Sequence, residues 1–330
     1  MGQRSGQREA APPDMPRFHV IKAGMLTTVQ DRGRWGLQSR GVPVAGPMDS
    51  ASHRLANALV GNDAGAATLE VTLVGPELEF DDERVVAVAV AEFELTVDGR
   101  SEPASAAFVV AAGSRLRFGR RSRGARAYLA TAGGLAVASI FGSRATHLIS
   151  AMGGIDGRAL EAGDELPLGD PMRARRRSSA QPRSPILILP EGHATVRVLP
   201  GPQQEYFTSG ALDALQSAPY KIAMSSDRMG FRLEGPALTH ARGANIISDA
   251  TPLGVLQVPG SGQPILLMAD RRTTGGYPKI ATTISADISL AGQLGPGDMI
   301  SFAVCSPREA MAALIEQERA LMAVEASAGS

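Results

Sequence analysis

Short apolar runs, separated by glycine, proline and aspartate, recur along the whole chain and predict a protein built mainly from β-strands. Runs rich in Val, Ile and Leu that end at turn-forming residues are typical of strands. They lie at Val85–Ala91, Ala107–Ala112, Ala127–Ala130, Ile186–Leu189, Thr195–Leu199, Ile265–Met268 and Met299–Val304. Many short strands of this kind favour a closed or sandwiched β-architecture.

Helical patterns are few. Asp49 is a suitable N-cap for a helix over Ser50–Val60, and Gly61 provides a stop. A second helix is predicted over about Gln203–Gln216. In the last segment, Ser306 is a suitable N-cap, Pro307 suits the first helical position, and an apolar stripe follows.

The chain divides into two strand-rich halves that resemble each other. Leu73-Val-Gly-Pro-Glu-Leu78 is similar to Leu233-Glu-Gly-Pro-Ala-Leu238, and a second pair of similar segments follows in the same order. Between the halves lies a polar, arginine-rich stretch with proline at both ends. We therefore expect a disordered tail at 1–16, an N-terminal domain at 17–169, a linker at 170–184, a C-terminal domain at 185–305 and a final helix at 306–330.

The amino-acid composition indicates which classes of binding partner are not expected. Lysine plus arginine equals aspartate plus glutamate at 33 each, so nucleic acid or an anionic membrane is not expected as a partner. The single cysteine, Cys305, allows no disulfide within the chain. The N-terminus has no secretory h-region, and no window is long and apolar enough to span a bilayer. These features predict a cytoplasmic protein.

Familiar catalytic motifs are absent from the sequence. It contains no Walker A loop, no G-x-G-x-x-G after a strand, no H-E-x-x-H and no G-x-S-x-G. The five histidines are scattered without metal-ligand spacing, so we expect no metal site.

Polar, glycine-rich loops remain as candidates for chemistry. The most conspicuous follows the apolar run that ends at Ala269, and a second arginine-containing loop spans Ser226–Arg232. The arginine fork donates two parallel hydrogen bonds to a carboxylate or a phosphate, so these loops suit an acidic substrate. Internal neutralisation by Asp227 and Asp270 is the alternative interpretation, and the residues alone leave both open.

Two loops of the first half complete the candidates. One contains Gln30, Asp31 and Arg34. The other runs through Gly46, Pro47, Met48 and Asp49 into the first predicted helix. Its glycines would let backbone N–H groups approach an anion at the helix N-terminus, although a plain capped turn explains the same residues.

A dozen short motifs, in order, resemble the family of carboxyltransferase subdomain A and B proteins, which includes allophanate hydrolase subunit 2, the KipI antagonist KipA and the C subunit of 5-oxoprolinase. The motifs cover roughly residues 18–304. They include Thr28-Val-Gln-Asp-x-Gly-Arg34, Gly41-Val-Pro-x-x-Gly-Pro-Met-Asp49, Leu69-Glu-x-Thr-Leu-x-Gly-Pro76, Ser226-Asp-Arg-Met-Gly-x-Arg-Leu233 and Asp270-Arg-x-Thr-Thr-Gly-Gly-Tyr-Pro278.

The resemblance implies a mainly β fold of two cyclophilin-like β-barrel domains with a few short helices. It also implies two partners: a KipI-like protein, equivalent to the B subunit of 5-oxoprolinase, and a LamB/YcsF-type protein, equivalent to its A subunit. The leading hypothesis is the C subunit of a bacterial ATP-dependent 5-oxoprolinase that opens 5-oxo-L-proline to L-glutamate. ATP would act in the complex, and isolated-chain activity is left open.

Under this hypothesis we assign roles to the loop residues. Asp270, Arg271 and Tyr277 are the predicted catalytic residues. The predicted substrate-binding residues are Arg228, Arg232, Gln257, Gly275, Gly276, Gln30, Asp31, Arg34, Gly46, Pro47, Met48 and Asp49. A small amide or carboxylate is the expected substrate class.

Two alternatives stay open. The chain could be the carboxyltransferase half of a biotin-dependent urea carboxylase or allophanate hydrolase system, with biotin supplied by another domain because no A-M-K-M segment is present. A non-catalytic, KipA-like antagonist of a KipI-like histidine kinase inhibitor is the other alternative. Its partner surface would be the final helix, unless that helix packs on its own barrel.

Overall fold

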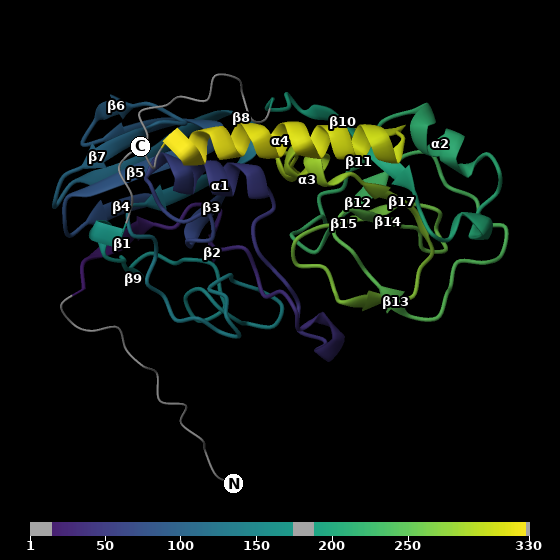
Figure 1. The fold of residues 1–330 in the computed structure, drawn as a ribbon, viewed down its shortest axis with the longest axis horizontal. Coiled ribbons are helices and arrows are strands. Elements are labelled where there is room, and N and C mark those ends of the chain that lie inside the picture. The colour runs from purple at the N-terminus through teal and green to yellow at the C-terminus, as the bar shows by residue number, and fades with distance from the viewer. Residues whose placement is uncertain (1–14, 174–187, 328–330) are drawn as a thin grey trace, which may run out of the picture.

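The computed structural model describes residues 15–173 and 188–327 and shows two β-rich bodies side by side (Figure 1). A single long helix, α4 (Pro307–Ser327), crosses both of them on one side. The predicted mainly β fold with few helices is confirmed. All the predicted strands between residues 85 and 130 and between 195 and 304 lie within observed strands or overlap them. Residues 188–189 of the run Ile186–Leu189 form no strand, and 186–187 lie outside the described residues.

The N-terminal body is a strongly curled sheet. Its central strand β8 pairs with β3, β4 and β5, and β5 and β8 together form a long two-stranded ribbon. Phe18, Leu69, Val88 and Leu129 are among the core residues inside the curl. The elements are β1 (Arg17–Lys22), β2 (Leu26–Gln30), η1 (Gln38–Arg40), α1 (Ser50–Leu59), β3 (Thr68–Thr72), β4 (Glu77–Phe80), β5 (Arg84–Val97), β6 (Arg100–Glu102), β7 (Ala107–Val110), β8 (Arg115–Thr131), β9 (Glu165–Pro167) and η2 (Pro171–Arg173).

The C-terminal body is a closed barrel. Its strand order is β10-β17-β14-β15-β12-β11-β18, and parallel pairing of β18 with β10 closes it. The elements are β10 (His193–Pro200), η3 (Gln204–Tyr206), α2 (Ala211–Ser217), β11 (Tyr220–Ile222), β12 (Gly230–Glu234), β13 (Asp249–Ala250), β14 (Val255–Gln257), β15 (Ile265–Leu267), β16 (Thr274–Gly275), β17 (Lys279–Thr283), α3 (Ser285–Gly292) and β18 (Met299–Val304). The two-residue strands β13 and β16 pair outside the barrel.

Two of the three predicted helices form as expected. The Asp49 side chain accepts a hydrogen bond from the Ser52 N–H at the start of α1. At the start of α4, Ser306 and Glu309 form a reciprocal capping box. The prediction over Gln203–Gln216 is wrong in its first half, because the chain forms η3, then an irregular stretch, and only then α2. The sequence prediction missed α3.

Helix α4 does not pack on the C-terminal barrel alone. Leu321 and Val324 are buried in one cluster with residues of α1 and β5 in the N-terminal body. Arg54 of α1 donates hydrogen bonds to both carboxylate oxygens of Glu318 at 2.8 Å. Because α4 follows the last barrel strand, it clamps the two bodies together.

A second contact between the bodies is polar and almost solvent-free. The Arg126 guanidinium in β8 donates to the carbonyls of Gly292 and Leu294, at 2.5 and 2.9 Å. The Gln293 side chain donates to the Asp49 carboxylate at 2.8 Å. Gly292 lies so close to the Met48 carbonyl that a Cβ there would be 2.2 Å from its oxygen. This interface fixes the loop before α1 against the end of α3.

None of the helices in the described part of the chain is long and apolar enough to cross a membrane.

Candidate functional site

A cavity of about 610 Å³ opens on the C-terminal barrel, formed by β12, β14, β15 and the loops that carry β13 and β16. Five of the predicted site residues line it: Arg232, Gln257, Gly275, Gly276 and Tyr277. The segment from Thr274 to Tyr277 therefore forms a wall of this cavity.

Five polar lining residues are not among the predicted site residues: Asp227, Asn245, Thr251, Arg272 and Thr274. Asp227 and Thr274 are specified positions of the recognised motifs, which were the available signal for them, whereas Arg272 occupies the unspecified position of Asp270-Arg-x-Thr-Thr-Gly-Gly-Tyr-Pro278. Asn245 and Thr251 are brought in by the loop around β13, which no motif marked. Arg232 and Arg272 are exposed, and neither forms a salt bridge with another described residue. The cavity thus presents two arginines available for an anionic ligand.

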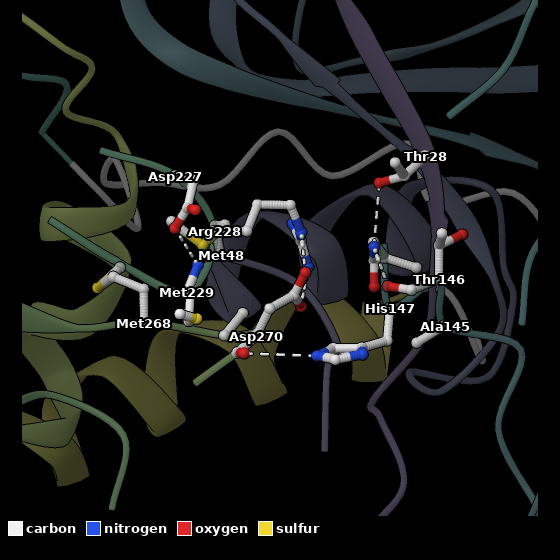
Figure 2. Close-up of polar contacts among 12 residues, drawn as sticks. Thr28, Met48, Ala145, Thr146, His147, Asp227, Arg228, Met229, Met268 and Asp270 are labelled. Atoms are coloured by element: carbon white, nitrogen blue, oxygen red, sulfur yellow. Dashed lines mark hydrogen bonds and ion pairs between the residues drawn. The ribbon is translucent and has the colours of Figure 1, made fainter. Parts of the chain in front are cut away.

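Arg228 and Arg271, the other arginines predicted in the C-terminal body, are buried. Arg228 is buried between the two bodies, where Figure 2 shows it facing Asp270. Its Nε and Nη2 atoms each lie 3.1 Å from an Asp270 carboxylate oxygen, and its Nη1 pairs with Glu70 of β3. Its Nη2 also donates to the Gly46 carbonyl at 2.6 Å. For Arg228 and Asp270, the structure therefore shows the internal neutralisation that the sequence left as an alternative.

Glu70 is the member of this cluster that sequence reasoning missed. Its carboxylate accepts hydrogen bonds from the Met48 N–H at 2.8 Å and from the Tyr128 hydroxyl at 2.6 Å. Burial favours the neutral acid, but the charges of Arg228 and Arg126 outweigh it and lower the pKa of Glu70. Burial alone would lower the pKa of Arg228, but the negative charges of Asp270 and Glu70 outweigh this effect and raise the pKa.

Arg271 is buried and is not among the residues that line the cavity. Its Nε donates to the Thr251 carbonyl at 2.8 Å, and its Nη1 donates to the Met268 carbonyl at 3.4 Å. Burial lowers the pKa of Arg271 to about 10, with Asp270 acting in the opposite direction. Since Thr251 lines the cavity, Arg271 supports a wall from behind.

The predicted residues of the first loop hold a neighbouring loop. Asp31 accepts a hydrogen bond from the Ser143 hydroxyl at 2.6 Å, and Arg34 Nε donates to the Ile140 carbonyl at 3.2 Å. Gln30 is buried and donates to the Thr146 carbonyl at 3.1 Å. The next residue, His147, reaches the C-terminal body, where its Nε2 lies 3.4 Å from the Asp270 carbonyl (Figure 2).

The predicted residues of the second loop lie at the interface between the bodies. Pro47 is half-buried there and Met48 is part of the barrel's core cluster. The Asp49 N–H donates a hydrogen bond to the Tyr128 hydroxyl. Burial raises the pKa of the Asp49 carboxyl group, although four hydrogen bonds to the carboxylate act in the opposite direction. The structure therefore uses the N–H groups of Met48 and Asp49 internally. None of the N-terminal candidates lines the cavity.

The arrangement of a closed barrel, a curled sheet and their shared loops matches known proteins. The sequence profile of the carboxyltransferase domain, subdomain A and B, matches residues 40–304. The chain belongs to this family. Its fold is that of solved members: the Kluyveromyces lactis urea carboxylase gives a TM-score of 0.87 at 32% identity, over 95% of this chain and 30% of that one. TTHA0988 gives 0.79 at 39% identity, over 88% of this chain and 56% of that one.

Sequence relatives fall into two groups that differ in length. The chain is 39% identical to the C subunit of 5-oxoprolinase from Escherichia coli (strain K12), over 91% of this chain and 95% of that protein. It is 34% identical to a putative urea carboxylase of Emericella nidulans, over 93% of this chain but only 26% of that protein. The chain thus spans nearly the full length of the first relative and about a quarter of the second.

Proposed function

We propose that this chain is the C subunit of an ATP-dependent 5-oxoprolinase and that the barrel cavity binds 5-oxo-L-proline. The observation that carries the proposal is the end-to-end match, at 39% identity, to a protein named as the C subunit of 5-oxoprolinase. The Haemophilus influenzae protein of the same name supports it, with 35% identity over 92% of its length. The cavity supplies matching chemistry.

The substrate has one carboxylate and one cyclic amide. In the proposed binding mode, Arg232 and Arg272 hold the carboxylate or a developing anion, since both residues line the cavity without a protein carboxylate as partner among the described residues. Gln257 and Tyr277 supply neutral hydrogen-bonding groups for the ring amide. The reaction adds water across the ring C–N bond: the carbonyl carbon gains the water oxygen, and the nitrogen leaves with a proton.

The buried residues take a supporting role in this proposal. Asp270 and Arg271 were predicted to act on the substrate, but the Asp270 carboxylate bonds to Arg228 and the Arg271 side chain bonds to backbone carbonyls. We assign both to holding the cavity walls. Arg228 joins them, because its chain neighbours Asp227 and Met229 line the cavity.

ATP supplies the driving force for ring opening when it is bound in the complex. Within this chain, the exposed arginines of the cavity fit an anionic phosphoryl group, whereas in the glycine-containing loop before α1 the N–H groups of Met48 and Asp49 are already bonded to Glu70 and Tyr128. We therefore propose that the companion A-type and B-type subunits complete the nucleotide site. The companions are a LamB/YcsF-type protein and a KipI-like protein.

The test combines the chain with both companion subunits, ATP and 5-oxo-L-proline, and measures glutamate. We expect Arg272→Ala and Arg232→Ala each to lower kcat/KM about 10- to 150-fold, the range for one charge-assisted hydrogen bond. Arg100→Ala, which removes an exposed arginine from β6, is the matched control and should retain full activity. An assembled complex that makes no glutamate would refute the proposed function.

The carboxyltransferase function is the second candidate, and the structural match to urea carboxylase favours it. In that case the cavity would receive a biotin carried by another domain, together with a small amide such as urea. The two candidates separate in one experiment. Carboxylation of urea that requires a biotinylated carrier supports the second, whereas biotin-independent glutamate formation supports the first.

A further inference from the structure

Four large apolar side chains are exposed on three connections, before α1, between β8 and β9, and before β13: Trp35, Phe141, Ile149 and Ile247. Each exposes 61% or more of its surface, and Ile247 exposes 94%. Trp35 is the only tryptophan of the chain. A single exposed apolar residue needs no explanation, but several gathered on one surface mark a site of interaction.

Hydrogen bonds connect these loops in a row. The Trp35 loop is joined to the Phe141 loop by the Arg34–Ile140 and Asp31–Ser143 contacts described above. The following segment carries Ile149 and reaches Asp270 through His147. Further along the segment that begins at Asp270, the Gly276 carbonyl accepts the Ile246 N–H at 2.9 Å, so the loop that carries Ile247 pairs with this segment. Figure 1 shows the loop before α1, the loops between β8 and β9, and β13 on the side of the molecule away from α4.

Basic side chains accompany this row. Arg32, Arg40, Arg144 and Arg242 are exposed on the same loops, and none forms a salt bridge with a carboxylate in the described ranges. The exposed carboxylates on the same stretches are Asp156 and Glu161, between β8 and β9, and Asp249, which is paired with Lys279, so the four arginines outnumber them. The chain as a whole has no net charge, so this excess of positive charge is local. We call the four apolar residues and these four arginines the loop edge.

We propose that the loop edge is the docking surface for a second, different polypeptide whose contacting face has an apolar centre and an acidic rim. The charge supports a different protein rather than a second copy, because two arginine-rimmed faces of this chain would repel each other. Trp and Arg are the residues that carry most binding energy at protein interfaces.

Docking there would also affect the cavity. Ile246, Gly276 and Tyr277 line the cavity, and Ile247 is the direct neighbour of Ile246. A protein seated on the loop edge would therefore cover the mouth of the cavity and shield it from water. This inference rests on the proposed function in one respect: the expected partner is a companion subunit of the complex.

The single tryptophan makes the proposal directly measurable. The probe is the purified B-type companion, added to the full-length chain while tryptophan emission is recorded. The same titration with Trp35→Phe gives the companion's own emission for subtraction. We expect the Trp35 emission to shift to shorter wavelength and to become protected from acrylamide quenching, because the indole leaves water on docking.

Substitutions then locate the surface. Trp35→Ser and Ile247→Ser should each weaken binding at least about 30-fold, as expected for central interface residues. Arg144→Glu should slow association and reduce its dependence on salt concentration. Met311→Ser is the matched control, because Met311 is also an exposed apolar residue but lies on α4, on the other side of the molecule. It should bind with unchanged affinity.

The contrary outcomes are distinct. Unchanged Trp35 emission, or no binding of the companion at all, would overturn the proposal. A concentration-dependent shift without companion, with a dimer seen by light scattering, would make the occupant a second copy and overturn it too. Glutamate assays on the same mixtures separate the two proposals: a Trp35 shift without turnover removes the proposed function alone, and turnover with unchanged Trp35 emission removes the docking surface alone.

Discussion

Arg228→Met is the most informative perturbation of the buried cluster between the two bodies. The substitution keeps much of the length and apolar volume of the side chain but removes the guanidinium. Asp270 then loses both of its 3.1 Å contacts, and Glu70 loses its pair. Glu70 keeps the Met48 N–H and the Tyr128 hydroxyl, whereas the carboxylate of Asp270 keeps none of its side-chain donors among the described residues.

The size of the expected destabilisation follows from the Asp270 carboxylate, which is left buried without a charged partner among the described residues. Removing one partner of a buried ion pair costs about 3–5 kcal/mol, since the remaining charge is left without compensation. We therefore expect Arg228→Met to lower the free energy of unfolding by about 3–5 kcal/mol at neutral pH. Arg232→Met is the matched control on the same segment. Its side chain is exposed and unpaired among the described residues, so the expected change is within about 0.5 kcal/mol.

The pH dependence has a definite sign. The folded pKa of Glu70 is lowered, so Glu70 stabilises the native protein above its unfolded pKa, and this contribution is lost as pH falls. Arg228→Met removes the largest charge that lowers this pKa. The loss in free energy of unfolding caused by Arg228→Met should therefore be greatest at neutral pH. It should shrink as the solution is made acidic enough to protonate carboxylates.

Urea unfolding followed by fluorescence and circular dichroism measures these differences. Asp270→Asn in the Arg228→Met background should recover part of the lost stability, because it removes the stranded charge. The reasoning is refuted if Arg228→Met is as mild as Arg232→Met, or if Asp270→Asn destabilises the Arg228→Met protein further.

Three further predictions concern α1 and α4. Burial lowers the pKa of His53 to about 4, so the unfolded chain takes up the proton first as pH falls; between about pH 7.5 and pH 5 we expect a loss of about 2 kcal/mol that His53→Gln abolishes in urea unfolding. Leu321→Ala should destabilise by about 2–5 kcal/mol, against about 0.5 kcal/mol or less for the exposed Met322→Ala, and equal effects would show that α4 is not anchored through Leu321. Glu309→Ala removes the acceptor for the Ser306 N–H, so hydrogen exchange in the first turn of α4 should quicken about fivefold, and unchanged exchange would contradict the capping box.

Local signals explain why much of the fold could be predicted. The caps at Asp49 and Ser306 act within three residues, and the apolar runs report strands directly. Helix α3 was missed because it is short and most of its residues are buried, so it shows no amphipathic period. The helix predicted from Gln203 was interrupted at Thr208–Gly210, where the chain turns before α2.

The placement of the candidate site residues depends on contacts between distant parts of the chain, which local sequence patterns do not reveal. Arg228 and Arg232 are four residues apart in one motif, yet one is buried between the bodies and the other lines the cavity. The two arginines differ because Arg228 pairs with Glu70, a residue 158 positions away in the sequence. Asp31 and Arg34 are likewise bonded to the loop that contains Phe141. Residue type identified the polar loops, but only the tertiary structure shows which side chains are free to meet a ligand.

The position of α4 has a consequence for synthesis. The apolar surface of α1 is covered by Leu321 and Val324, and Arg54 of α1 meets a partner 271 positions later in the chain. Because translation is vectorial, the N-terminal body emerges from the ribosome with this surface uncovered and must wait while the whole barrel is made. The nascent chain therefore offers chaperones an apolar binding surface throughout that interval, and α4, which is made after the barrel, removes it.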